Sequence, residues 1–136
     1  MSKKSKRTYK YGDQPMRVII VQVVELLGGA ATLKNVDAYL RSKFPHYRDN
    51  THLNLAINTV NCNRSHWDCN KVARRTDDVT HRYHEYDRLF KRGKIFEIYQ
   101  PSVHGIWELY QDQQGKWCYR QVKSEFEEAV EAAAKL

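Results

Sequence analysis

The chain has 136 residues, of which 41% are hydrophobic and 12% aromatic, so it can bury the core of one globular domain and is not a disordered tail. Its formal net charge of +7 favours a polyanionic partner such as a nucleic acid. No apolar run approaches the length of a membrane span, and no apolar stretch follows the basic N-terminus as in a secretory signal, so we expect no membrane partner.

The three cysteines are odd in number and irregularly spaced, which argues against a disulfide scaffold and for a reducing compartment. We therefore expect a cytoplasmic protein. Residues 1–14 form a basic arm that can follow a phosphate backbone or serve as a solubilising tail.

Two helices and a short strand are predicted after the arm. Apolar residues keep helical spacing from Met16 to Leu27, and Gly28-Gly29 ends this helix because glycine reaches the left-handed cap conformation. Ala30-Ala31 is a candidate strand. Thr32 is then a fair N-cap for a second helix, which Pro45 closes.

A third helix is predicted over Tyr47–Arg64, with one apolar stripe and a second face that carries Thr51, Asn54, Asn58 and Asn61. Asparagine can make a bidentate pair with an adenine edge in the major groove. The alternative is a solvated face on an ordinary helix.

Residues 62–85 lack periodicity and are predicted as a long loop, which is either functional or contains a further element. The spacing of Cys62, His66 and Cys69 fits no common zinc site, so we expect no metal. No glycine-rich phosphate loop, nucleophile elbow or kinase signature is present in the sequence. We expect neither a cofactor nor an enzymatic activity.

Strand-forming residues return over Ile95–Gln100 and Ile106–Tyr110, which we predict as a hairpin closed by the turn 101–105, with a third strand at 116–122. Ser124 is a candidate N-cap for a C-terminal helix, which Phe126 and Val130 are expected to anchor to the body.

Three helices followed by a hairpin predict an α+β winged-helix fold over residues 15–122, with residues 123–136 as an added C-terminal helix. The expected core residues are Ile19, Ile20, Val23, Leu27, Val36, Leu40, Leu53, Ile57, Val60, Ile98, Trp107 and Leu109.

Two stretches resemble a known family: Leu26-Leu27-Gly28-Gly29-Ala30-Ala31-Thr32-Leu33, and the run from Tyr86 to Tyr110 with its glycine-aromatic-x-leucine-tyrosine end. Together they resemble the winged-helix domains associated with prokaryotic restriction endonucleases and DNA-modification systems. The resemblance covers about Pro15 to Tyr110. It implies that the segment from Asn50 to Asn61 enters the major groove as the recognition helix, with the turn 101–105 as the wing.

The expected contacts fall into three groups. Base edges are to be read by Asn50, Thr51, Asn54, Asn58 and Asn61. The wing residues are Ser102 and His104. The DNA backbone is to be contacted by Lys3, Lys4, Lys6, Arg7, Arg48, Arg64, Lys71, Arg74 and Arg75.

The predicted function is therefore a double-stranded DNA-binding module, sensitive to sequence or base modification, within a restriction or defence system that includes a nuclease or methyltransferase partner. One alternative is a protein-protein interaction adaptor that uses Trp67, Trp107 and Tyr110, because the fold alone does not decide function. Single-stranded nucleic acid is a third reading, which needs aromatic residues such as Tyr9, Tyr11 and Tyr47 beside basic ones.

Overall fold

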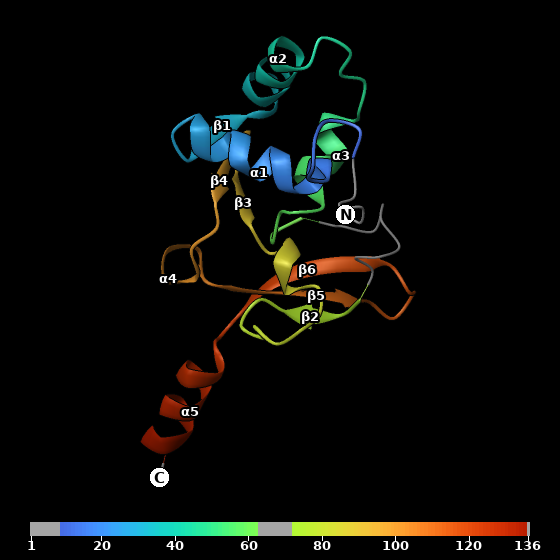
Figure 1. Cartoon of the computed structure of the whole chain (residues 1–136). Coiled ribbons are helices and arrows are strands. Elements are labelled where there is room, and N and C mark those ends of the chain that lie inside the picture. The colour runs from blue at the N-terminus through green and yellow to red at the C-terminus, as the bar shows by residue number, and fades with distance from the viewer. Residues whose placement is uncertain (1–8, 63–71, 136) are drawn as a thin grey trace, which may run out of the picture.

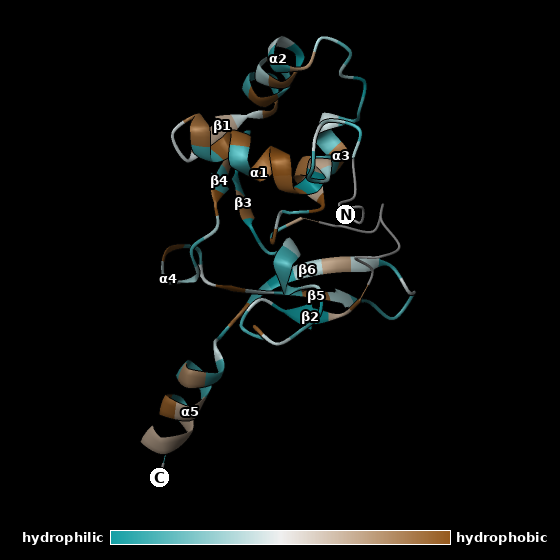
Figure 2. Ribbon diagram, viewed as in Figure 1, coloured by the Kyte–Doolittle hydropathy of each residue, from teal (hydrophilic) through white to brown (hydrophobic). Residues whose placement is uncertain are grey.

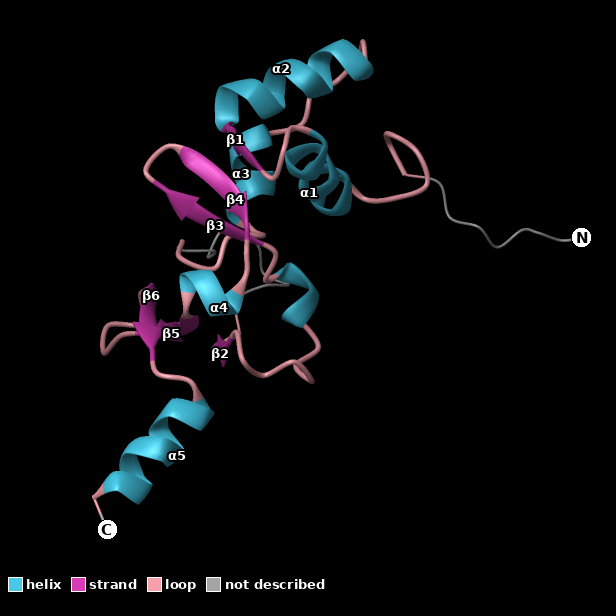
Figure 3. Cartoon of the chain, turned by 90° about the vertical axis from the view of Figure 1, so that its left-hand side faces the viewer, coloured by secondary structure: helices cyan, strands magenta, loops and turns pink. Residues whose placement is uncertain are grey.

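The computed structural model describes residues 9–62 and 72–135, which form a mixed α+β structure with two three-stranded antiparallel sheets (Figure 1). The sheets have the strand orders β1-β4-β3 and β2-β5-β6. Figure 3 shows that α1, α2 and α3 gather around the first sheet, while the second sheet lies below it and α5 projects away from both.

Helix α1 (Met16–Leu26) is the predicted first helix, and the two glycines after it end it as expected. Gly28 and Gly29 both have positive φ, 103° and 89°, and the Gly29 N–H donates to the carbonyl of Val24 at 2.9 Å. This backbone reversal leads directly into β1 (Ala30–Thr32), which confirms the short strand.

Helix α2 (Leu33–Lys43) follows β1 without a break, because Thr32 is both the last strand residue and the N-cap. The Thr32 side chain accepts a hydrogen bond from the Asn35 N–H at 3.1 Å. The predicted start of the second helix is confirmed.

Helix α3 spans only Thr51–Ala56, so the long helix predicted up to Arg64 is wrong. Thr59 donates its hydroxyl to the Leu55 carbonyl at 2.7 Å, and the Asn58 amide donates to the Asn54 carbonyl at 3.0 Å. Such side chains bond to helix carbonyls locally and favour the helix end over its continuation. The chain then runs beside β3, where the Val60 N–H donates to the Leu89 carbonyl at 2.8 Å.

The hairpin of the first sheet is formed by β3 (Leu89–Arg92) and β4 (Ile95–Ile98), with Arg92 opposite Ile95. Gly93 has φ 61° at the first central position of this two-residue turn, which suits a type II′ hairpin. Strand β1 pairs with the other edge of β4.

The hairpin predicted between residues 95–100 and 106–110 is therefore wrong. Their supposed turn is the single helical turn α4 (Pro101–His104), which joins the two sheets. Strand β5 (Ile106–Gln111) pairs with β6 (Trp117–Val122) on one side and with β2 (Arg74–Arg75) on the other. The third strand predicted at 116–122 is thus present, as β6.

The predicted loop 62–85 also contains regular structure where it is described. Strand β2 lies within it, and a 3₁₀ turn, η2 (His84–Tyr86), stands at its end. A strand of two residues is too short to produce a periodic signal in a sequence.

Helix α5 (Glu125–Ala134) is confirmed, with the Ser124 hydroxyl accepting from the Glu127 N–H at 3.0 Å. Its predicted anchor is wrong, because the side chains of Phe126 and Val130 are 78% and 52% exposed. None of the described helices is long and apolar enough to cross a membrane.

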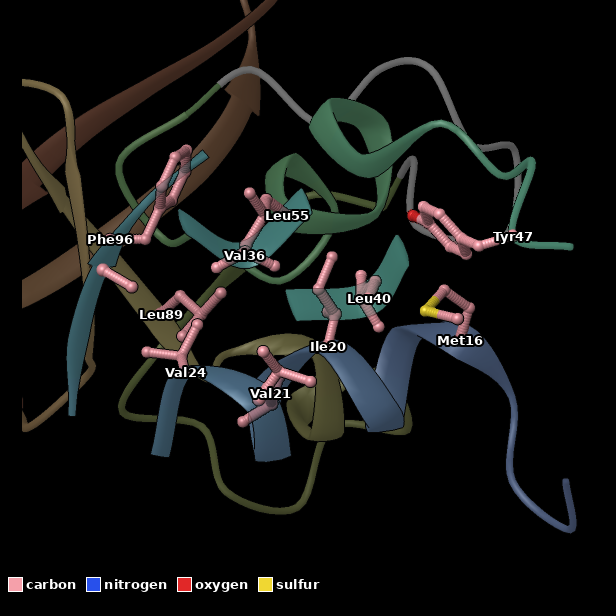
Figure 4. Close-up of a cluster of buried hydrophobic side chains, with 12 residues drawn as sticks. Met16, Ile20, Val21, Val24, Val36, Leu40, Tyr47, Leu55, Leu89 and Phe96 are labelled. Carbon is pink, nitrogen blue, oxygen red and sulfur yellow. The ribbon is translucent and has the colours of Figure 1, made fainter. Parts of the chain in front are cut away.

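The main core lies between the three first helices and the first sheet, and Figure 4 shows Ile20, Val36, Leu40 and Leu55 meeting in it. Hydrophobic residues along α1 supply much of it (Figure 2). Of the predicted core residues, those that are buried are Ile20, Val23, Val36, Leu40, Ile57, Val60 and Leu109. Those that are only partly buried are Ile19, Leu27, Leu53, Ile98 and Trp107.

Polar contacts join the second sheet to the chain just before β3. Nη2 of Arg74 lies 3.2 Å from Oδ1 of Asp87, with side-chain exposures of 1% and 0%. Nearby, the Tyr99 hydroxyl is 2.7 Å from the Thr76 hydroxyl and donates to the Gly105 carbonyl at 2.5 Å. The two sheets are therefore connected through buried polar groups as well as through α4.

Candidate nucleic-acid interface

The asparagines predicted to read bases are turned into the protein. Asn58 is 1% exposed, and its side-chain amide donates to the carbonyls of Arg17 and Asn54, both at 3.0 Å. Asn54 is 8% exposed and donates to the carbonyl of Asn50 at 3.0 Å. Asn58 thus links the end of α3 to α1, while Asn54 bonds within its own helix, so the prediction that they contact bases is wrong.

Thr51 is also buried, and its hydroxyl donates to Oδ1 of Asp37 at 2.6 Å. This hydrogen bond, together with one from Arg41, holds the pKa of Asp37 below its usual value. Base contact by Thr51 is therefore wrong as well. Asn50 is exposed and serves as the N-cap of α3, accepting from the Leu53 N–H at 3.0 Å.

The side chain of Asn61 forms hydrogen bonds with the backbone of β3. Its amide oxygen accepts from the Lys91 N–H and its amide nitrogen donates to the Lys91 carbonyl, both at 2.8 Å. This is the pattern that a neighbouring strand would make. Asn61 thus fixes the chain after α3 to the hairpin and sets the position of Lys91.

Two of the arginines expected to contact phosphates instead pair with carboxylates of the chain itself. Arg74 is buried against Asp87, so its assignment to the DNA backbone is wrong. Arg75 makes two hydrogen bonds to Asp77, both at 3.1 Å, and Asp77 raises the pKa of its guanidinium. Arg48 is exposed. The remaining predicted backbone contacts lie outside the described residues: Lys3, Lys4, Lys6, Arg7, Arg64 and Lys71.

The predicted wing residues do not form a hairpin tip. His104 is 7% exposed, with its ring stacked on Phe90 at 4.3 Å between centroids. Its Nδ1 accepts from the Gln100 N–H at 3.0 Å, so its Nε2 carries the proton and donates to Oε1 of Glu97 at 2.9 Å. The assignment of His104 to a wing surface is wrong. Ser102 is exposed on α4.

Two of the aromatic residues proposed for an adaptor surface, Trp107 and Tyr110, contact other side chains of the chain itself. The Trp107 indole donates to the His104 carbonyl at 2.8 Å, and its ring lies 5.9 Å from that of Phe90. Arg120 covers the ring of Tyr110 at 4.2 Å. Trp67 lies outside the described residues, as do His66 and Cys69 of the cysteine-histidine stretch. Among residues 9–62 and 72–135, no His, Cys, Asp and Glu side chains cluster closely enough to hold a metal ion.

A groove that was not predicted from the sequence brings three lysines together. It lies between the start of α2, helix α3 and the β3–β4 hairpin, and its lining residues are Thr32, Leu33, Lys34, His52, Lys91, Lys94 and Phe96. We call it the α2–hairpin groove. The motif Lys91-Arg92-Gly93-Lys94, a glycine turn between strand-forming residues, is the signal that could have placed two of its lysines at a hairpin tip.

The groove is lined by three lysines, Lys34, Lys91 and Lys94. Among the described residues, no carboxylate lies within ion-pairing distance of Lys34, Lys91 or Lys94. By contrast, many other cations have carboxylate partners, namely Lys10, Arg17, Arg41, Arg92, Arg120 and Lys123. The positive charge of the groove is therefore available to a ligand.

A second pocket, beside α1, has a mixed charge. It is lined by Arg17, Glu25, Glu85 and Arg88, and Arg17 already lies 3.4 Å from Glu85. Opposite charges in one small pocket cancel much of its attraction for an anion. We therefore place the candidate interface at the α2–hairpin groove.

Comparison of the chain with protein-family models, curated proteins and solved structures gives no match. The resemblance to restriction-associated winged-helix domains stays a prediction.

Proposed function

We propose that the chain is a double-stranded DNA-binding module of the winged-helix kind, with the β3–β4 hairpin as its wing. Support comes from the order of elements: helix α1, strand β1, helices α2 and α3, and then the hairpin whose strand β4 pairs with β1. This wing carries Lys91 in strand β3 and Lys94 in its turn, whereas the turn predicted from the sequence, 101–105, has no Lys or Arg.

The observation that carries the proposal is the set of lysines around the α2–hairpin groove that have no carboxylate partner within residues 9–62 and 72–135. Lys34 lies in the first turn of α2 on one side, while Lys91 and Lys94 belong to the hairpin on the other. Ammonium groups without a carboxylate partner can neutralise phosphates, and the Nζ of Lys91 also lies 5.6 Å from the centre of the Phe96 ring. Because the side chains of Asn54 and Asn58 are hydrogen-bonded within the fold, we propose contacts mainly to the DNA backbone, with little direct reading of bases.

The groove favours a duplex over a single strand. Binders of single strands stack bases on exposed aromatic side chains. The aromatic residue that lines this groove is Phe96, which is 4% exposed, so it offers no stacking platform.

The test is a titration of a labelled duplex at several salt concentrations, comparing wild type with Lys91→Gln/Lys94→Gln. Each phosphate contact adds about 0.9 to the slope of log affinity against log salt, so the variant should lose roughly 1.8 from that slope and bind at least about tenfold more weakly at low salt. The matched control is Lys43→Gln/Lys116→Gln, which removes the same charge from two exposed lysines outside the groove.

The control should keep the wild-type slope to within experimental error. Equal losses in both variants would mean that only net charge matters, and the groove would not be the site. Absence of duplex binding by the wild type at low salt would reject the proposed function.

A further inference from the structure

The pocket beside α1 is lined by charged side chains of both signs, and we call it the α1 pocket. Helix α1 forms one wall with side chains along one of its faces, from Arg17 to Glu25. The other wall is formed by Asn58, just after α3, and by Glu85 and Arg88, which precede β3. The pocket has a volume of about 190 Å³, below the roughly 300–1,000 Å³ of sites for drug-sized ligands, so its size suits one small molecule.

The buried amide of Asn58 offers an acceptor to such a molecule. Its nitrogen donates to the backbone carbonyls of Arg17 and Asn54, both at 3.0 Å. Because both partners are acceptors, this atom is the amide nitrogen and the other is the oxygen. No group within residues 9–62 and 72–135 donates a hydrogen bond to that oxygen, and it is not fully enclosed. Since Asn58 is 1% exposed and lines the α1 pocket, its oxygen is open to a ligand there.

The charged groups of the α1 pocket divide into one ion pair and two groups that do not meet. Nη1 of Arg17 lies 3.4 Å from Oε1 of Glu85, so these two charges largely cancel. Glu25 and Arg88 form no ion pair, either with each other or with another charged group in the part of the chain that the structure describes. The pocket therefore presents one carboxylate and one guanidinium to a ligand, and its charges balance.

We propose that the α1 pocket binds a zwitterion of the α-amino acid class with a small aliphatic side chain. The ammonium group of the ligand donates to the carboxylate of Glu25 and to the amide oxygen of Asn58. The carboxylate of the ligand accepts from the guanidinium of Arg88, in the kind of charge-assisted hydrogen bond that is stronger than a neutral one. Val18 and Val21 line the same pocket and supply apolar contacts for the side chain.

A zwitterion satisfies this set of groups better than a simple ion does. An anion would pair with Arg88, but it would be repelled by Glu25 and would leave the Asn58 oxygen without a donor. A cation would pair with Glu25 and be repelled by Arg88. The α1 pocket shares no lining residue with the α2–hairpin groove, so this inference does not depend on the proposed binding of DNA.

An NMR titration of the full chain with L-alanine, L-valine and L-leucine tests the proposal. The backbone amide signals of Gln22 and Arg88 and the side-chain amide signals of Asn58 should shift saturably at millimolar concentrations of ligand. Each amino acid is paired with two analogues, one without the ammonium and one without the carboxylate. For leucine these are 4-methylpentanoate and 3-methylbutylamine. Each analogue should bind at least about tenfold more weakly than its amino acid, because one charged group of the pocket is left without a partner.

Two variants assign the charged contacts. Glu25→Gln and Arg88→Gln alter exposed side chains, so both should fold, and each should weaken binding of the amino acid at least about tenfold. Arg88→Gln should also remove the preference for leucine over 3-methylbutylamine, which is a change that a merely structural role of Arg88 would not cause. The matched controls are Glu127→Gln and Arg48→Gln, which remove the same charges from exposed positions outside the pocket and should bind as the wild type does.

Three results would overturn the proposal. The first is an absence of saturable shifts with all three amino acids. The second is binding of the analogues as tightly as the amino acids, because the two charges of the ligand would then not be read together. The third is an equal loss of affinity in the control variants and in the pocket variants.

Discussion

The buried ion pair between Arg74 and Asp87 gives the sharpest prediction about the fold. The sequence predicts Arg74 at the DNA backbone, whereas the structure places it in the interior with 1% side-chain exposure. The variants Asp87→Ala and Arg74→Met should therefore unfold the protein more easily, and should leave the binding of duplex DNA by the folded protein unchanged.

The magnitude follows from what each substitution leaves behind. Removing one partner of a buried pair leaves an uncompensated charge, which typically costs about 3–5 kcal/mol. Domains of this size are stable by only about 5–15 kcal/mol, so either variant should lose a large part of its stability. For a chain of this length the melting temperature should fall by roughly 10–20 °C.

Urea denaturation of the two single variants and of Arg74→Met/Asp87→Leu measures the coupling between the partners. The double variant should be much more stable than the sum of the single losses indicates, because apolar residues of similar volume replace a buried pair at little net cost. Losses below about 1 kcal/mol in both single variants would refute the buried position of the pair.

Three further predictions concern the core, the buried amide and one carboxylate. Leu40→Ala and Ile57→Ala should each lower the free energy of unfolding by about 2–5 kcal/mol, measured by denaturant titration, because both side chains are buried. Asn58→Ala should cost about 1–3 kcal/mol in the same assay, through two lost hydrogen bonds, while leaving discrimination between duplex sequences unchanged in a binding assay. The hydrogen bond from Arg92, followed by the one from His104, lowers the pKa of Glu97 from its usual 4.5. These bonds to the carboxylate therefore stabilise the fold above pH 4.5, and the stabilisation is lost as the pH falls through the lowered pKa. Glu97→Gln should thus be less stable than the wild type at pH 7, with the difference in unfolding free energy shrinking as the pH falls below 4.5.

The local signals in the sequence were sufficient for most helix ends. Thr32 and Ser124 cap their helices as predicted, and Gly28 and Gly29 end α1, because each of these features depends on neighbours within a few residues. The mixed α+β class followed from the same signals.

The pairing of strands is harder to predict from the sequence, because β4 has a strand-forming segment on each side of it, β3 before and β5 after. The segment after it contains a proline and a glycine and was predicted as the hairpin turn, but the tight Gly93 turn before it forms the hairpin. Pairing is decided by contacts across the whole sheet, which propensity does not encode.

The candidate site was missed for a related reason. A polar stripe on a helix has the same sequence pattern whether it faces a ligand or braces the fold. Only the packing of α3 against α1 shows that Asn58 bonds to the Arg17 carbonyl. Likewise, the lysines of the groove come from α2 and from a hairpin far along the chain, so their proximity could not be seen before the fold was known.

We propose that duplex DNA binds at the α2–hairpin groove, and an NMR titration of isotope-labelled protein with a short duplex tests this proposal most directly. The amide signals of Lys34, His52 and residues 91–94 should shift most, and saturably, while those of β5 and β6 should shift little. Large shifts concentrated in the β5–β6 hairpin, or no shifts at low salt, would contradict the claim.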